Sequence, residues 1–152
     1  MPTPITPITP TTPLGINHIR LTVTDVARSQ AFYTAVLGFT VAREPRAGDD
    51  PATRAFNAAL FGGVVLVANG IRLGLRPVAP AGDRFDEDRV GLDHLSFTVA
   101  GRADLARAVR LLDARGTPHG GIQDLGPEFG LHILAFRDPD NVQLELSAPY
   151  AR

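Results

Sequence analysis

Two histidines and one glutamate are the residues of this sequence best suited to bind a divalent metal ion. His18 and His94 hold the same position in two copies of one stretch, GINHIRLTV at residues 15–23 and GLDHLSFTV at residues 91–99. Glu145 lies in the alternating run QLEL near the C-terminus. Two imidazoles and one carboxylate suit Fe²⁺, Mn²⁺, Zn²⁺ or Ni²⁺, and three protein ligands leave coordination positions open for a substrate. The sequence therefore predicts a catalytic metal site formed by His18, His94 and Glu145, with a purely structural pairing of these groups as the alternative.

Strands and helices in a repeated order must position these residues. Both repeated stretches alternate apolar and polar residues, which is the pattern of a half-buried strand. A helix capped by Asp25 and ended by Gly38 follows the first, and an amphipathic helix ended by Gly116 follows the second. Asn69-Gly70 predicts a tight hairpin, because both residues tolerate positive φ. The further expected strands are residues 39–43, 64–67, 71–75, 119–123, 131–136 and 142–147.

The two halves can be aligned to their last strands. Matching the turn at Asn69-Gly70 with the turn at Asp140-Asn141 sets Gly74 where Glu145 stands. One half therefore offers a carboxylate at this position and the other offers no side chain. The expected fold is α+β, with two βαβββ modules.

We expect one domain over residues 15–152, composed of module 1 (15–76), a linker (77–90) and module 2 (91–148). Residues 1–14 are rich in proline and threonine, which predicts a disordered tail. Residues 44–54 (EPRAGDDPATR) are interpreted as a loop, because proline, glycine and charge are concentrated there.

The composition limits the kinds of partner that this protein can bind. The formal net charge is −1 and the signs are mixed, which argues against nucleic acid as a partner. No apolar run approaches the ~20 residues that span a bilayer, and no secretion signal is evident. The chain has no cysteine, so a disulfide framework and a thiolate site are excluded. We expect a cytoplasmic protein that binds a small molecule.

The alternation of side chains along a strand places further polar residues on the faces that carry the ligands. An arginine beside an open metal position suits an anionic or enolate-bearing substrate, so Arg20 is a candidate catalytic residue. A salt bridge to Glu145 or to a loop acid is the alternative role for Arg20 and Arg72. His132, on the strand before Glu145, is a candidate acid or base. The candidate substrate-binding residues are Arg72, Thr22, Ser96, Thr98 and Gln143.

The chain resembles the vicinal oxygen chelate superfamily, the group of glyoxalases, bleomycin resistance proteins and extradiol dioxygenases. The resemblance covers nearly everything after Gly15. It is carried by residues 17–19 (NHI), 32–33 (FY), 37–39 (LGF), 93–95 (DHL) and 136–145 (FRDPDNVQLE). It implies an α+β fold in which two paired βαβββ modules form a curved mixed sheet around a metal cavity, and it implies a homodimer.

The resemblance also narrows the activity. Glyoxalase I enzymes and epimerases of this group use a fourth protein ligand at the position of Gly74, so the match to them is weakened. Extradiol dioxygenases and fosfomycin thiol transferases use two histidines and one glutamate, but the dioxygenases carry a tyrosine where this chain has Ala135. We expect a metalloenzyme that chelates and activates a small oxygenated substrate, as a dioxygenase, lyase or transferase. The alternative is a metal-free antibiotic-binding protein of the bleomycin resistance type, or a scaffold in which the histidines only pair with acids.

Overall fold

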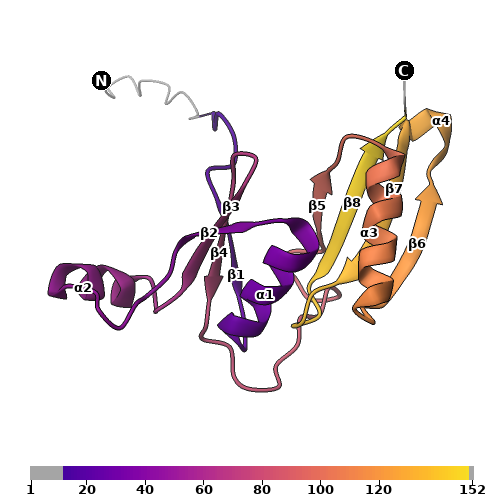
Figure 1. The fold of residues 1–152 in the computed structure, drawn as a ribbon. Helices are drawn as coiled ribbons and strands as arrows, with labels where there is room; N and C mark the ends of the chain where they lie inside the picture. The colour runs from indigo at the N-terminus through magenta and orange to yellow at the C-terminus, as the bar shows by residue number, and fades with distance from the viewer. Residues whose placement is uncertain (1–11, 151–152) are drawn as a thin grey trace, which may run out of the picture.

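A computed structural model describes residues 12–150 of the chain, so most of the predicted N-terminal tail lies outside the described residues. Two helices and four strands form each half (Figure 1). The elements of the first half are β1 (Ile19–Thr22), α1 (Val26–Leu37), β2 (Thr40–Arg43), α2 (Pro51–Ala59), β3 (Val64–Ala68) and β4 (Ile71–Arg76). Those of the second half are β5 (Leu95–Thr98), α3 (Arg102–Ala114), β6 (His119–Asp124), α4 (Gly126–Phe129), β7 (Leu131–Arg137) and β8 (Gln143–Pro149).

Each half contains one mixed sheet, and the two sheets have the same topology. The strand orders are β1-β4-β3-β2 and β5-β8-β7-β6. The first strand of each half pairs in parallel with the last, and the remaining pairs are antiparallel. The registers are equivalent as well, because Arg20 pairs with Gly74 and Ser96 pairs with Glu145. The predicted βαβββ repeat and the alignment of Gly74 with Glu145 are confirmed.

The two long helices begin and end where their sequences indicate. The carboxylate of Asp25 accepts a hydrogen bond from the Arg28 backbone N–H at 3.0 Å and caps α1, and Gly38 ends this helix in the left-handed conformation (φ 69°). On α3, Leu105, Ala108 and Leu112 lie at intervals of three and four residues, and all three are buried. Each helix therefore covers one face of its own sheet and leaves the opposite face free to carry polar side chains.

The expected loop at residues 44–54 is wrong in its second half, where α2 begins. Asp50 caps this helix by accepting hydrogen bonds from the backbone N–H groups of Ala52 and Thr53, and Pro51 occupies its first turn. Proline is favoured there because its missing N–H would have no partner inside the helix. The Asp-Pro pair that suggested a loop is thus a helix start.

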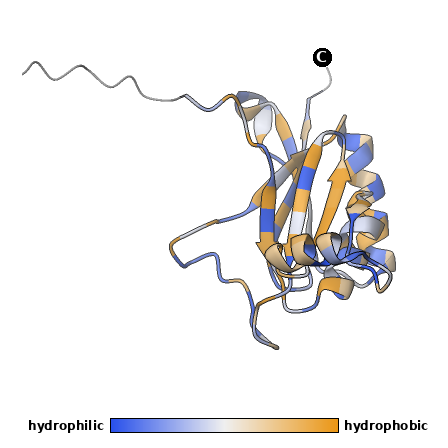
Figure 2. Ribbon diagram, turned by 90° about the vertical axis from the view of Figure 1, so that its left-hand side faces the viewer, coloured by the Kyte–Doolittle hydropathy of each residue, from blue (hydrophilic) through white to orange (hydrophobic). Residues whose placement is uncertain are grey.

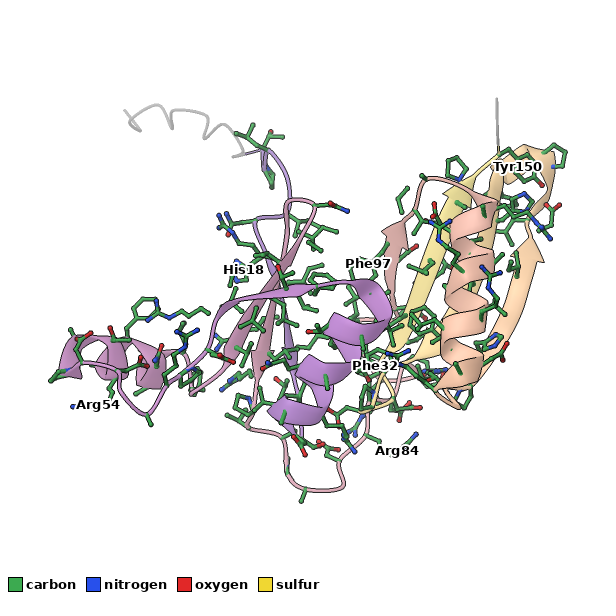
Figure 3. All side chains as sticks on the ribbon, in the orientation of Figure 1. His18, Phe32, Arg54, Arg84, Phe97 and Tyr150 are labelled. Atoms are coloured by element: carbon green, nitrogen blue, oxygen red, sulfur yellow. The ribbon has the colours of Figure 1, made fainter. Side chains whose placement is uncertain are left out.

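One continuous hydrophobic core connects the two modules. The ring of Phe32 on α1 lies 6.4 Å from the ring of Phe136 on β7, and that of Phe39 lies 6.0 Å from that of Phe97 on β5. In Figure 3, Phe32 and Phe97 lie between the two halves. The core thus forms on the side of both sheets that bears α1 and α3.

A polar turn of module 2 reinforces this contact. The carboxylate of Asp140 accepts hydrogen bonds from the backbone N–H (3.0 Å) and the hydroxyl (2.5 Å) of Thr24, and from the guanidinium of Arg28 (2.6 Å). The neighbouring Asp138 accepts a hydrogen bond of 2.8 Å from the Tyr33 hydroxyl. Residues 138–141 therefore hold the start of α1 from the other module.

The helices of residues 12–150 are all too short or too polar to cross a bilayer.

Candidate metal and substrate site

The two repeated histidines have equivalent hydrogen bonds. The side-chain oxygen of Asn17 lies 3.0 Å from Nδ1 of His18, and a carboxylate oxygen of Asp93 contacts Nδ1 of His94. An oxygen acceptor selects the tautomer in which Nδ1 carries the proton, so the lone pair is on Nε2. Metal-binding histidines are commonly oriented by such a partner. In both imidazoles Nε2 therefore keeps its lone pair available to coordinate a metal ion.

Glu145 lies on the same face of its sheet as His94. It pairs with Ser96, two residues after His94 on β5, and the Ser96 hydroxyl donates a hydrogen bond of 2.7 Å to Glu145 Oε1. No salt bridge to Glu145 occurs among the described residues. The carboxylate is thus oriented by one neutral donor and keeps its second oxygen available.

The equivalent face of module 1 carries His18 and arginines. Arg20 lies opposite Gly74, and a Cβ built on Gly74 would lie 3.2 Å from Cγ of Arg20. The side chain that module 1 lacks at this position is replaced by the aliphatic part of Arg20. The Arg20 guanidinium donates a hydrogen bond of 2.6 Å to the carbonyl of Leu60, so the salt bridge considered for Arg20 is not formed among the described residues.

The helix α2 and the residues that follow it cover this face. The guanidinium carbon of Arg20 lies 5.6 Å from the centre of the Phe61 ring, and that of Arg76 lies 4.0 Å from the same centre. Between α2 and the sheet is a cavity of about 350 Å³. Its lining residues are Asn17, His18, Arg20, Phe56, Leu60, Gly63, Val64, Val65, Arg72 and Gly74.

The predicted ligands form two groups in one chain. His94, Ser96 and Glu145 lie together on module 2, whereas His18 lies on the α2 side of module 1, as Figure 3 shows for His18. Within residues 12–150 no three His, Asp or Glu side chains are arranged to hold a metal ion. A single copy of the chain therefore does not assemble the predicted three-ligand site.

The other predicted substrate-binding residues are distributed over both modules. Arg72 lines the cavity under α2 and Gln143 pairs with Arg137 on the Glu145 face. Ser96 and Thr98 line a cavity of about 440 Å³ together with His18 and Arg72. Thr22 lines a separate cavity of about 380 Å³ together with Arg84 and Asp140. Ser96, Gln143 and Arg72 are thus placed beside candidate ligands, and Thr22 lies away from them.

His132 does not fit the predicted role of acid or base at this site. It pairs with Ala148, on the face that carries buried Leu134 and Leu146, whereas Glu145 pairs with Ala135 on the opposite face. Its ring instead lies 4.5 Å from that of Tyr150. Since residues 132 and 135 differ by an odd number, the alternation of the strand already places them on opposite faces.

Two contributors to the site were missed in the sequence. The residue that orients each histidine is its direct predecessor, so the pairs Asn17-His18 and Asp93-His94 carried a signal that could have been recognised. The second contributor is α2, whose first residues were interpreted as part of a loop and which carries Phe56 into the cavity lining.

Comparison with known proteins identifies relatives of this fold. The profile of the Glyoxalase/Bleomycin resistance protein/Dioxygenase superfamily matches residues 15–146. Uncharacterized protein YwkD of Bacillus subtilis (strain 168) is 33% identical over 131 residues, which cover 86% of this chain and 94% of that protein.

Solved structures show the same fold. A glyoxylase/bleomycin resistance protein/dioxygenase domain from Frankia sp. EAN1pec is 33% identical, with a TM-score of 0.72 over 91% of this chain and 93% of that one. A variant of the fosfomycin resistance protein FosX from Listeria monocytogenes, complexed with Mn(II) and 1S,2S-dihydroxypropylphosphonic acid, is 15% identical. Its TM-score is 0.64 over 89% of this chain and 90% of that one. The chain therefore belongs to the Glyoxalase/Bleomycin resistance protein/Dioxygenase superfamily.

Proposed function

We propose that this protein is a metal-dependent enzyme whose site is completed by two copies of the chain. His94 and Glu145 of one protomer and His18 of the second hold the divalent cation, and each dimer has two such sites. The observation that carries the proposal is the matched orientation of the two histidines, each with Nδ1 bonded to its preceding residue and Nε2 free.

The free edges of the two sheets support the sharing between copies. Within residues 12–150, β1 and β5 each pair with a neighbour on one side only. Apolar residues at equivalent positions, Ile16 and Leu92, lie two residues before each histidine and are 83% and 40% exposed. An unpaired strand edge beside exposed apolar side chains is a surface that a second strand can cover. Pairing β1 of one copy with β5 of the other brings His18 to the face of His94 and Glu145.

The substrate is a small organic molecule with two adjacent oxygen atoms. The bound cation supplies Lewis acidity that stabilises negative charge developing on these oxygens, for oxygenation with iron or for isomerisation, lyase or addition chemistry with manganese, zinc or nickel. Gly74 contributes no fourth protein ligand, which leaves a coordination position of the cation for the substrate. Arg20 provides positive charge beside this position, and Ser96 orients Glu145. The Mn(II) and the phosphonic acid in the FosX complex agree with such a site.

Complementation between two inactive variants tests the proposal. His18→Ala and Glu145→Ala are each expected to lose bound metal, measured by elemental analysis of protein prepared without chelator. After the two variants are mixed, unfolded and refolded together, half of the dimers are mixed and each has one intact site. The mixture should recover about a quarter of the wild-type metal content, whereas each variant refolded alone should recover none.

Two results would contradict the proposal. If the mixture binds no more metal than the separate variants, the site is not shared between copies. If wild-type protein and both variants bind added cations equally, these residues are not ligands, and the metal-free binding protein becomes the better interpretation.

A further inference from the structure

We infer that the cavity between α2 and the sheet of module 1 is a binding site for an oxyanion group of the substrate, held by Arg20 and Arg72. This inference rests on the proposed function, since it assigns the substrate class of the same site. It adds to the site the helix α2 with Phe56, the following Phe61, and Arg43 and Arg76, which contact these two rings.

The arginines on this face lack carboxylate partners among the described residues. Elsewhere in the chain Arg28, Arg46, Arg107 and Arg137 pair with aspartate or glutamate. None of the described salt bridges involves the four arginines that share the outer face of the first sheet, Arg20, Arg43, Arg72 and Arg76. In Figure 2, which turns this side toward the viewer, hydrophilic segments interrupt the hydrophobic strands. The face therefore has an excess of positive charge.

Aromatic rings take the place of acids in this cluster. Phe61 is contacted by Arg20 and Arg76, and the ring of Phe56 lies 4.2 Å from the guanidinium carbon of Arg43. A guanidinium that stacks on a ring keeps its N–H edge free to donate two parallel hydrogen bonds. Nε of Arg76 is buried and has no hydrogen-bond partner in the described part of the chain. One nitrogen of Arg20 donates to the Leu60 carbonyl, and Nε of Arg43 donates to the Asn57 side chain, so the cluster is fixed in position and the remaining N–H groups of Arg20 are left for a ligand.

The backbone at Phe61 is specialised for this contact. Phe61 has a φ of 58°, in the left-handed region that residues other than glycine rarely adopt, and Gly62 follows with a φ of 67°. Such a conformation costs on the order of 1 kcal/mol or more and persists where the surroundings enforce it. Here it places the ring against two guanidinium groups.

The cavity itself contains positive charge and no acid. The cavity has a volume of about 350 Å³, and the residues that line it include Arg20, Arg72 and His18 but no aspartate or glutamate. The apolar wall from Phe56, Leu60 and Val65 lowers the local dielectric, which strengthens a charge-assisted hydrogen bond. Because His18 lines the same cavity, a substrate whose anionic end binds the arginines has its other oxygens near the metal ligand.

Calorimetric titration of chelator-treated protein with inorganic phosphate at low ionic strength tests this inference, and acetate serves as a second probe. We expect wild-type protein to bind phosphate, and Arg72→Gln to weaken binding about tenfold, the loss of one charge-assisted contact. Arg110→Gln is the matched control, because Arg110 is exposed on α3 and should leave the affinity unchanged. Stronger binding of phosphate than acetate indicates a phosphoryl or phosphonyl group, and the reverse indicates a carboxylate.

The inference is overturned if wild-type protein binds neither anion, or if Arg72→Gln and Arg20→Gln, shown to be folded by circular dichroism, bind with wild-type affinity. This readout is independent of the metal. A protein that passes the complementation test but fails here keeps the shared metal site and loses only the oxyanion site.

Discussion

Asp138 is a buried carboxylate, only 5% exposed, and it connects the two modules. Its Oδ1 accepts hydrogen bonds from the backbone N–H groups of Asp140 (2.9 Å) and Val142 (2.7 Å), and its Oδ2 accepts one from the hydroxyl of Tyr33. Burial raises the pKa of Asp138 above its usual range, and nearby Asp140 adds to the shift. Burial and the adjacent carboxylates also raise the pKa of Tyr33, so its hydroxyl remains a proton donor.

Replacing Tyr33 with phenylalanine should destabilise the fold. Tyr33→Phe leaves Oδ2 of Asp138 buried without its donor, which costs about 1–3 kcal/mol in the free energy of unfolding. Urea denaturation at pH 7 measures the difference. The other tyrosine provides a control, because Tyr150 contacts exposed Asp124 and Tyr150→Phe should change stability by no more than about 0.5 kcal/mol. Equal losses in the free energy of unfolding for both variants would mean that the buried hydrogen bond between Tyr33 and Asp138 stabilises the fold no more than the exposed contact of Tyr150.

The pH dependence of stability isolates the charge of Asp138. Since its folded pKa is raised, the stability it contributes is present below its unfolded pKa and is lost as the pH rises through its folded pKa. Asp138→Asn can accept the same backbone hydrogen bonds and donate to the Tyr33 oxygen, but it does not titrate. The stability of Asp138→Asn relative to wild type should therefore increase between pH 3 and pH 7 in urea denaturation series. A constant difference across this range would contradict the assignment.

At the scale of elements, α2 differs from the two long helices in what holds it. It buries only Asn57, whereas α1 and α3 each bury three residues in the core or beside it. Its cap is strong, because hydrogen bonds from the side chain and backbone of Thr53 lower the pKa of Asp50. The cap therefore stabilises α2 above the usual pKa of an aspartate and is lost as the pH falls through the lowered value.

Removing this cap should loosen α2 without unfolding the protein. Asp50→Ala is expected to speed amide hydrogen exchange in residues 52–59, while the urea midpoint stays near that of wild type. Phosphate binding should weaken in the same variant, because Phe56 and Phe61 are no longer held over the arginines. Asp25→Ala, which uncaps α1 on the core, should instead lower global stability by about 1 kcal/mol. Slow exchange in α2 of Asp50→Ala would show that tertiary contacts, not the cap, hold the helix.

The sequence was most informative where local chemistry decides the outcome. The hairpin at Asn69-Gly70 forms with positive φ at both residues (45° and 81°), and α1 ends at Gly38 as expected. The helix α2 was not predicted, because the proline and charged residues at its start were interpreted as loop signals. Asp50 and Pro51 instead form the capped first turn of this helix. His132 was misplaced because the face of a residue depends on register as well as on its strand.

At the scale of the whole molecule, the duplication predicts the modules but not how they meet. The equivalence of Gly74 and Glu145 follows from aligning the halves, and the strand pairing confirms it. Whether His18 faces His94 in its own chain depends on how the core joins the halves, which is decided by contacts such as Phe32 with Phe136. Those contacts join residues that are far apart in the sequence, so no local sequence pattern predicts them.

The linker between the modules is itself bound to the turn at residues 138–141. The Phe85 N–H donates to the carbonyl of Asp140 (2.8 Å), and the Asn141 side chain donates to the carbonyl of Phe85 (2.9 Å). The Arg84 guanidinium donates to the Asn141 side chain (2.9 Å), and Glu87 pairs with Arg137. Asp140 of the same turn accepts hydrogen bonds from Thr24 and Arg28 of the first half. A cut within residues 77–83 would leave the linker contacts inside the second fragment, while the hydrogen bonds of Thr24 and Arg28 with Asp140 and the shared core would still join the halves. Two fragments divided there should therefore reassemble on mixing.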